Sequence, residues 1–331
     1  MLDPSHLDRF GDAFKGRKAL ITGGAGFIGS HLAHAIHALG AHVTVLDDLS
    51  GGFRENLPSG VELIEASVLD AAALERAIDG AAFVYHQAAM VSVPQSVEQP
   101  ELCAQVNIVG TQGLLAAAKR AGAGRVCFAA SAAAYGDTPT LPCSESHAPD
   151  VYSPYAASKV AGELLCATYA RNFDLCAVAL RYFNIFGPRQ DPNSPYAAVI
   201  SAFAKRLLAG GQPSIFGDGN QTRDFTYIDN VVLANLLAST APAEPVAGRV
   251  FNIGTGERSN LLEVHAALNE ALDTPLPGGP TFGPVRAGDV RDSVADISRA
   301  RETLGYEPMV GLAEGLRSTM AWARTSPHFK A

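Results

Sequence analysis

A tyrosine and a lysine in the middle of the sequence have the spacing needed for acid–base chemistry. Tyr155 and Lys159 are four residues apart, which places both side chains on one face of a helix. A free tyrosine has a pKa of about 10 and is a poor base at neutral pH, but a neighbouring ammonium group favours its phenolate form. We therefore predict that Tyr155 moves a proton and that Lys159 assists it. The alternative is a core tyrosine beside a surface lysine.

Ser131 is predicted to act with this pair from the end of a strand. An apolar run over 125–130 leads directly into Ser131, and open α/β sheets bind ligands at the carboxyl ends of their strands. A hydroxyl group at that place can bond a reacting oxygen and relay its proton. A serine that only shapes a turn is the alternative.

A glycine-rich turn near the N-terminus predicts a dinucleotide site. Gly23, Gly26 and Gly29 follow a strand-like run and open a helical pattern. Glycines permit a tight turn and a close approach to a pyrophosphate, while the helix start directs free N–H groups at the phosphates. Asp47 ends the second strand, where a carboxylate bonds the ribose hydroxyls and repels a 2′-phosphate. The predicted cofactor is therefore NAD rather than NADP; a structural turn and a capping aspartate are the alternatives.

Strand-like and helical segments alternate through the first half of the chain. Strand-like runs cover 18–22, 42–46, 63–65, 82–86, 125–130 and 176–181, and helical patterns cover 27–39, 71–79, 101–121 and 155–172. This alternation predicts an α/β fold with a Rossmann-type doubly wound parallel sheet and a smaller C-terminal substrate-binding lobe. The predicted parts are an N-terminal extension over 1–16, an NAD-binding domain over 17–181 and a discontinuous, mainly substrate-binding lobe over 182–331. Segments of the lobe are expected to return to the NAD-binding domain.

Composition narrows the class of protein. The 331 residues suffice for one large core, and their net charge of −8 argues against nucleic acid as the main partner. The five cysteines show no C-x-x-C spacing, which indicates reduced thiols rather than disulfides or a metal site. The sequence has no apolar stretch typical of a signal peptide or a membrane helix. We expect a cytoplasmic enzyme without membrane contact.

Taken together, these motifs resemble those of the extended short-chain dehydrogenase/reductase family, and within it the UDP-hexose 4-epimerases, above all those that act on UDP-N-acetylglucosamine. The resemblance covers nearly the whole chain after residue 16. It implies a UDP-sugar substrate, NAD as cofactor and a role in supplying polysaccharide precursors. The cofactor-binding residues that it implies are Gly23, Gly26, Phe27, Ile28, Gly29, Asp47, Asp48, Ser67, Val68, Gln87, Ala88, Ala89, Asn107, Tyr155, Lys159 and Tyr182. The implied substrate-binding residues are Ser92, Ser131, Tyr155, Asn184, Ala198, Val199, Phe216, Arg223, Arg286, Asp289 and Ser293.

The implied contacts follow from the family's motifs. The stretch 191–200 resembles a uracil-binding segment, and Arg223 and Arg286 are expected on the diphosphate, because a guanidinium donates two hydrogen bonds at once. Asn107 resembles the asparagine that steadies the sheet near the active site. One departure is Ser67, which stands where the family usually has an aspartate near the adenine and so implies a weaker adenine contact.

The residues after Ser131 bear on which reaction the resemblance implies. Related 4,6-dehydratases carry Asp-Glu there and related decarboxylases carry a Ser-Glu pair, whereas this chain has Ala132 and Ala133. Alanine cannot move a proton, so elimination lacks its acid and base. What remains is removal of a hydride from C4, rotation of the 4-keto sugar and return of the hydride to its other face.

The choice of sugar rests on Ser293 together with the stretch 191–200, which resembles that of epimerases that handle N-acetylated UDP-hexoses. In these epimerases a bulky tyrosine at the position of Ser293 excludes an N-acetyl group, and a small residue admits it. The resemblance therefore implies UDP-N-acetylglucosamine/UDP-N-acetylgalactosamine, with UDP-glucose/UDP-galactose as a further pair. A UDP-glucuronate 4-epimerase is the main alternative. Another nucleotide-sugar dehydratase or decarboxylase, a plain dehydrogenase and a non-catalytic NAD-binding sensor stay open.

Two helical stretches, 101–121 and 155–172, are rich in alanine and leucine. In the family the matching helices pair across a two-fold axis, so the resemblance implies a homodimer with a four-helix interface. Helices that only cover the sheet are the alternative.

Overall fold

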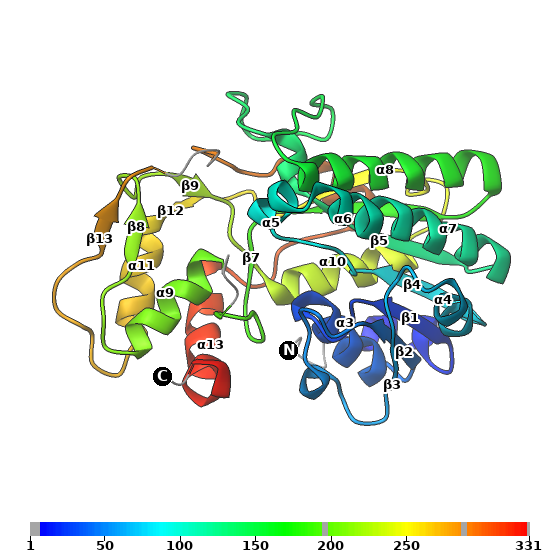
Figure 1. The fold of residues 1–331 in the computed structure, drawn as a ribbon, viewed down its shortest axis with the longest axis horizontal. Helices are drawn as coiled ribbons and strands as arrows, with labels where there is room; N and C mark the ends of the chain where they lie inside the picture. The colour runs from blue at the N-terminus through cyan, green and yellow to red at the C-terminus, as the bar shows by residue number, and fades with distance from the viewer. Residues whose placement is uncertain (1–6, 194–197, 286–289, 330–331) are drawn as a thin grey trace.

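A seven-stranded parallel sheet forms the centre of the protein in a computed structural model that describes residues 7–193, 198–285 and 290–329 (Figure 1). Its strands are β1 (Lys18–Thr22), β2 (His42–Asp47), β3 (Glu62–Glu65), β4 (Ala81–His86), β5 (Arg125–Ser131), β6 (Ala177–Tyr182) and β11 (Val250–Ile253). Their order is β11-β6-β5-β4-β1-β2-β3, with every pairing parallel. The predicted doubly wound α/β fold is confirmed.

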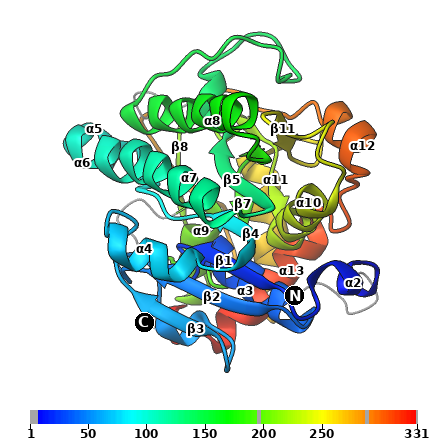
Figure 2. The ribbon, with the colours of Figure 1, turned by 90° about the vertical axis from the view of Figure 1, so that its right-hand side faces the viewer.

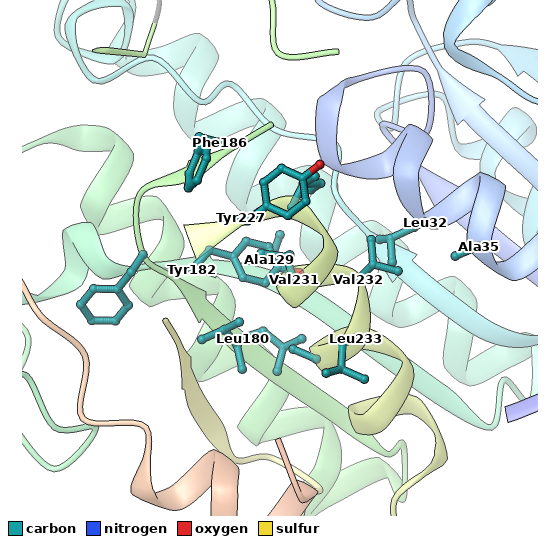
Figure 3. Close-up of a cluster of buried hydrophobic side chains, with 14 of the residues drawn as sticks. Leu32, Ala35, Ala129, Leu180, Tyr182, Phe186, Tyr227, Val231, Val232 and Leu233 are labelled. Carbon is teal, nitrogen blue, oxygen red and sulfur yellow. The ribbon is translucent and has the colours of Figure 1, made fainter. Parts of the chain in front are cut away.

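Helices cover both faces of this sheet. One face carries α4 (Ala71–Ile78), α7 (Gly110–Ala121) and α8 (Pro154–Phe173), and the other carries α3 (Phe27–Ala38) and α10 (Ile228–Thr240) (Figure 2). Successive residues of β5 belong to the two cores: Phe128 to the core that contains α7 and α8, and Ala129 to the core that contains α3 and α10. Figure 3 shows the cluster that contains Ala129, in which Val231, Val232 and Leu233 of α10 lie between Leu32 of α3 and Leu180 of β6. Strands buried on both faces explain the continuous apolar runs in the sequence.

The helical pattern predicted over 101–121 is confirmed, and a π turn interrupts its regular α-helical hydrogen bonding. The chain forms α5 (Val93–Glu98), α6 (Pro100–Ala104), a π-helical turn (Gln105–Val109) and then α7. Asn107 lies in the π turn, and its amide accepts a hydrogen bond from Met90 N and donates one to Met90 O. Single π turns inside helices are frequent at functional sites. A periodicity argument cannot detect a turn with one extra residue, so the π turn was not predicted.

The C-terminal half builds a lobe beside the sheet and also returns to it (Figure 1). Its elements are β7 (Ile185–Phe186), α9 (Val199–Leu208), β8 (Ser214–Phe216), β9 (Thr222–Arg223), β10 (Thr226–Tyr227), β12 (Ser259–Asn260), α11 (Leu261–Glu270), β13 (Thr281–Gly283), α12 (Ser298–Leu304) and α13 (Leu312–Thr325). The strands pair as β10-β7, β12-β9 and β13-β8, whereas β11 pairs with β6 in the main sheet.

Short helical turns complete the chain: Asp8–Phe10, Gly11–Phe14 (α2), Arg54–Asn56, Ala132–Tyr135 and Pro327–Phe329. The first two bring Phe14 into the core, where its ring lies 4.7 Å from that of Phe83. The predicted extension over 1–16 is thus packed on the sheet domain in its described part. Among the described residues, no helix combines the length and the apolar character needed to cross a membrane.

Candidate active site

The start of α8 positions the predicted acid–base pair. Ser153 caps the helix by accepting a hydrogen bond from Ala156 N at 3.1 Å, and Pro154 occupies the first helical position. Tyr155 follows in the first turn, and its backbone N donates to Ser96 Oγ at 3.1 Å. The Lys159 Nζ atom lies 5.8 Å from the centre of the Tyr155 ring. The helical spacing thus places the ammonium group beside the phenol.

Ser131 meets this pair from the last position of β5. Its hydroxyl group is hydrogen-bonded to the Tyr155 phenol and accepts a bond from Ala133 N at 3.2 Å. Burial raises the pKa of Tyr155, and the bond to Ser131 opposes that shift. Burial also lowers the pKa of Lys159 to about 8, while its Nζ donates to Ala129 O at 2.8 Å. The phenolate therefore depends on positive charge held close to it.

The glycine-rich turn leaves no room for a side chain at Gly23 or Gly29. A Cβ on Gly29 would lie 2.2 Å from Gly23 O, and one on Gly23, which has a φ of +66°, would lie 2.6 Å from Ala88 N. The helix α3 begins at Phe27 with Gly26 as its cap, and no side chain caps it. Phe27 and Ile28 form its first turn and are half-buried. The turn therefore presents bare backbone N–H groups at a helix start, which suits a phosphate group.

Asp47 holds this turn to the end of β2. Its carboxylate accepts bonds from Ala25 N and Leu49 N, both at 2.8 Å, and burial raises its pKa. The carboxylate of Asp48, by contrast, accepts a hydrogen bond from Ser50 N at 3.0 Å. Ser67 Oγ accepts a bond from Leu69 N at 3.2 Å, and Val68 is buried. The contacts of these residues with ribose and adenine stay predictions.

Three of the predicted cofactor-binding residues, Gln87, Ala88 and Ala89, directly follow β4. Ala88 N donates to Thr22 Oγ1 at 3.3 Å, Ala89 is half-buried, and Gln87 Nε2 donates to the Tyr182 hydroxyl at 3.4 Å. The Tyr182 hydroxyl also accepts a bond from Asn235 at 2.8 Å. Gln87 Oε1 is buried and has no hydrogen-bond partner. A buried acceptor of this kind is costly unless a ligand donates to it.

Several positioning residues were not found from the sequence. His86 is fully buried, and its ring nitrogens bond Thr22 Oγ1 at 2.7 Å and Thr111 Oγ1 at 2.9 Å. Burial lowers the pKa of His86 to about 3, so the imidazole is neutral. Ser158 accepts a bond from Asn107 Nδ2 at 2.9 Å and donates to Tyr155 O at 2.7 Å. These bonds join the glycine turn, the π turn and the catalytic helix.

A cavity of about 190 Å³ in the lobe brings together four of the predicted substrate residues. Asn184, Val199, Phe216 and Arg223 all line it, although they come from four separate segments. Arg223 Nη1 donates to Thr222 O at 2.9 Å and to Arg291 O at 3.1 Å. Gln221 lines the same cavity and was not among the predicted site residues.

The other predicted substrate residues lie outside this lining. Ala198 caps α9 and is exposed, and Ser92 caps α5 by accepting a bond from Gln95 N at 3.2 Å. Ser293 is buried, and its backbone N donates to Thr222 O at 3.1 Å, next to Arg223. Arg286 and Asp289 fall outside the described residues. A second cavity of about 260 Å³, between Thr255 and Leu312, contains none of the predicted residues.

Asp47→Asn is expected to weaken NAD binding by roughly tenfold, because an amide has one acceptor oxygen where the carboxylate has two. The variant should also bind NADP better relative to NAD, since it no longer repels a 2′-phosphate. Calorimetric titration with both dinucleotides measures each effect. Asp12→Asn, on the exposed surface of α2, is the matched control. Unchanged affinities for both dinucleotides would exclude Asp47 from the ribose site.

Comparisons with known proteins agree with this geometry. The model of the NAD-dependent epimerase/dehydratase family matches residues 19–254. A UDP-glucose 4-epimerase from Mycolicibacterium smegmatis is 41% identical over 314 residues, covering 93% of this chain and 98% of the relative. The structure of a UDP-N-acetylglucosamine 4-epimerase from Methanobrevibacter ruminantium, in complex with UDP-N-acetylmuramic acid, has a TM-score of 0.88 at 37% identity over 93% of this chain and 98% of that one. That of a UDP-glucose 4-epimerase from Thermotoga maritima, with UDP-glucose, has a TM-score of 0.88 at 39% identity with the same coverage.

The family and its cofactor require a glycine turn without side chains, an acidic residue at the end of β2 and a tyrosine–lysine pair on α8. Each is present in this chain, and the crowding at Gly23 and Gly29 together with the unpartnered oxygen of Gln87 fits a bound dinucleotide. The chain belongs to the NAD-dependent epimerase/dehydratase family, and NAD is its cofactor.

Proposed function

We propose that this protein is a UDP-sugar 4-epimerase whose favoured substrate pair is UDP-N-acetylglucosamine/UDP-N-acetylgalactosamine. The observation that carries the reaction is the grouping of Ser131, Tyr155 and Lys159 at the carboxyl end of β5, followed directly by Ala132 and Ala133. This group can exchange one proton with a sugar hydroxyl. The two alanines cannot serve as the further acid and base that elimination of water requires.

The chain's own residues have distinct roles in this proposal. Tyr155 takes the proton from the C4 hydroxyl and later gives it back, and Ser131 bonds the same oxygen. Lys159 favours the phenolate and binds the nicotinamide ribose. NAD, when bound, supplies the reversible hydride chemistry. Asn184 and Arg223 hold the nucleotide in the 190 Å³ cavity, so that the sugar can turn while its anchor stays in place.

The preference for an N-acetylated sugar is supported by the size of residue 293. Ser293 is a small side chain next to the segment that carries Arg223. Relatives named for UDP-N-acetylglucosamine and for UDP-glucose resemble this chain about equally well, so UDP-glucose/UDP-galactose is the second candidate pair. UDP-glucuronate is the main alternative substrate.

Proton NMR of the purified protein with UDP-N-acetylglucosamine, and with no NAD added, tests the proposal. The expected result is the appearance of UDP-N-acetylgalactosamine, since the cofactor is regenerated in each turnover. A spectrum that stays unchanged even with added NAD would exclude this substrate and direct the test to UDP-glucose and UDP-glucuronate. No conversion of any of the three would refute the epimerase proposal.

We also propose that two copies of the chain pair through α7, α8 and the helical turns before them. Apolar side chains lie exposed along this face, among them Leu102, Val109 and Leu164. Exposed apolar groups gathered on neighbouring helices mark interaction surfaces. Pairing them across a two-fold axis gives a four-helix interface.

Leu164→Glu is expected to convert the dimer into monomers at micromolar concentration. Leu164 is 64% exposed in the single chain, and a two-fold interface would bury two copies of the new carboxylate without partners. Light scattering coupled to size exclusion measures the mass. Arg76→Glu, on the exposed side of α4, adds a carboxylate elsewhere and should leave the mass unchanged. A wild-type protein that is itself monomeric would refute the dimer.

A further inference from the structure

Gln221 lies in the loop before β9 and lines the 190 Å³ cavity together with Asn184, Phe216 and Arg223. Its Nε2 donates a hydrogen bond to Phe216 O at 2.6 Å. A carbonyl oxygen can pair only with a donor, so this bond sets which way the amide faces. The Nε2 side of the amide therefore faces the backbone oxygen of Phe216, and Oε1 is the acceptor on the other side of the amide.

The Oε1 atom is buried and has no hydrogen-bond partner. Leaving such an acceptor unpaired is costly, and native proteins rarely do so without a reason. Because Gln221 lines the cavity, a bound molecule can supply the missing donor. The cavity that Gln221, Phe216 and Arg223 line together therefore suits a ligand group that carries an N–H or an O–H.

We propose that Gln221 Oε1 accepts the N3–H of the uracil base and thereby selects the nucleobase of the substrate. This inference rests on the proposed UDP-sugar function. Uracil offers one ring donor, N3–H, and thymine shares it. Cytosine has a bare acceptor at N3, which would face the acceptor oxygen of Gln221 and repel it. Gln221 is in this role a specificity-determining residue, separate from the catalytic group on α8.

Calorimetric titration with UDP, N3-methyl-UDP and CDP tests the proposal on the wild type and on two variants. Gln221→Met keeps the length of the side chain and removes the acceptor. Gln221→Glu keeps an acceptor oxygen and, when protonated, a donor for Phe216 O. Gln212→Met is the matched control, because Gln212 in the same lobe already has partners at both ends of its amide, His265 Nε2 at 2.7 Å and Pro277 O at 3.1 Å.

The wild type is expected to bind UDP at least about tenfold more tightly than N3-methyl-UDP or CDP. Neither of these two ligands can donate to Gln221 Oε1, and a buried acceptor left unpaired weakens binding by about this factor. Gln221→Met should bind UDP roughly tenfold more weakly than the wild type and lose most of the preference over CDP. Gln221→Glu should keep that preference, and Gln212→Met should match the wild type. A Gln221→Met variant that binds UDP as tightly as the wild type, or that keeps the full preference, would overturn the proposal.

The same titration separates this inference from the proposed function, since binding requires no turnover. If the wild type binds UDP but converts no UDP-sugar, the proposed epimerase activity is refuted. The titrations of the Gln221 variants still decide whether Gln221 selects the base. A wild type that epimerises UDP-sugars while Gln221→Met shows unchanged selectivity refutes the role of Gln221 alone. A wild type that does not bind UDP refutes both.

Discussion

Tyr155→Phe is expected to lower kcat by about a thousandfold or more while NAD stays bound. A positioned acid–base group contributes roughly 10² to 10⁴ in rate, and Tyr155 is the group that exchanges the C4 proton in the proposed mechanism. Phenylalanine keeps the ring that packs at the start of α8 and removes only the hydroxyl group, which bonds Ser131. The glycine turn and Lys159 are untouched, so the cofactor site should persist.

The matched control is Tyr152→Phe, three residues earlier on the chain. Tyr152 is 60% exposed, so losing its hydroxyl group should change kcat by less than about twofold. The measurements are kcat for UDP-N-acetylglucosamine and the NAD released on denaturation. Wild-type turnover in Tyr155→Phe would remove this residue from the mechanism. Loss of bound NAD together with loss of activity would instead indicate a role in holding the cofactor.

Ser293→Tyr is the second change with a large expected effect. It should lower kcat/KM for UDP-N-acetylglucosamine by about a hundredfold and largely spare UDP-glucose. The new ring would occupy space that the 2-acetamido group needs, and overfilling a packed site costs about 1–3 kcal/mol. The backbone N of Ser293 bonds Thr222 O, so the residue is held next to the segment that carries Arg223.

The control for Ser293→Tyr is Ser298→Tyr, which adds the same ring at an exposed position of α12. It should leave the ratio of the two kcat/KM values unchanged. Both ratios come from assays of the two UDP-sugars in parallel. An equal loss of both substrates in Ser293→Tyr would refute the selectivity argument, because general damage to the lobe affects every UDP-sugar alike.

Much of the fold was predictable because it depends on local patterns. Apolar runs that alternate with helical periodicity require a parallel sheet, and the seven strands confirm it. The glycine turn was recognisable because its residues are neighbours in sequence, and the tyrosine–lysine pair because four residues make about one helical turn. The helix predicted over 101–121 is present, but the π turn within it was not predictable from periodicity, and the bond between Asn107 and Met90 joins residues 17 apart.

The sequence by itself determined the fold class, the family and NAD as the cofactor, since each of these rests on short motifs with fixed spacing. Only the tertiary structure decided which distant side chains meet. The bond from Tyr155 N to Ser96 joins residues 59 apart, that from Thr22 to His86 joins residues 64 apart, and the cavity gathers Asn184, Val199, Phe216 and Arg223 from separate segments. The unpartnered oxygen of Gln221 likewise became visible only in the folded chain. A hydrogen bond forms only when the donor and acceptor atoms are placed to within a few tenths of an ångström. Residue types and their spacing in the sequence do not specify positions this accurately.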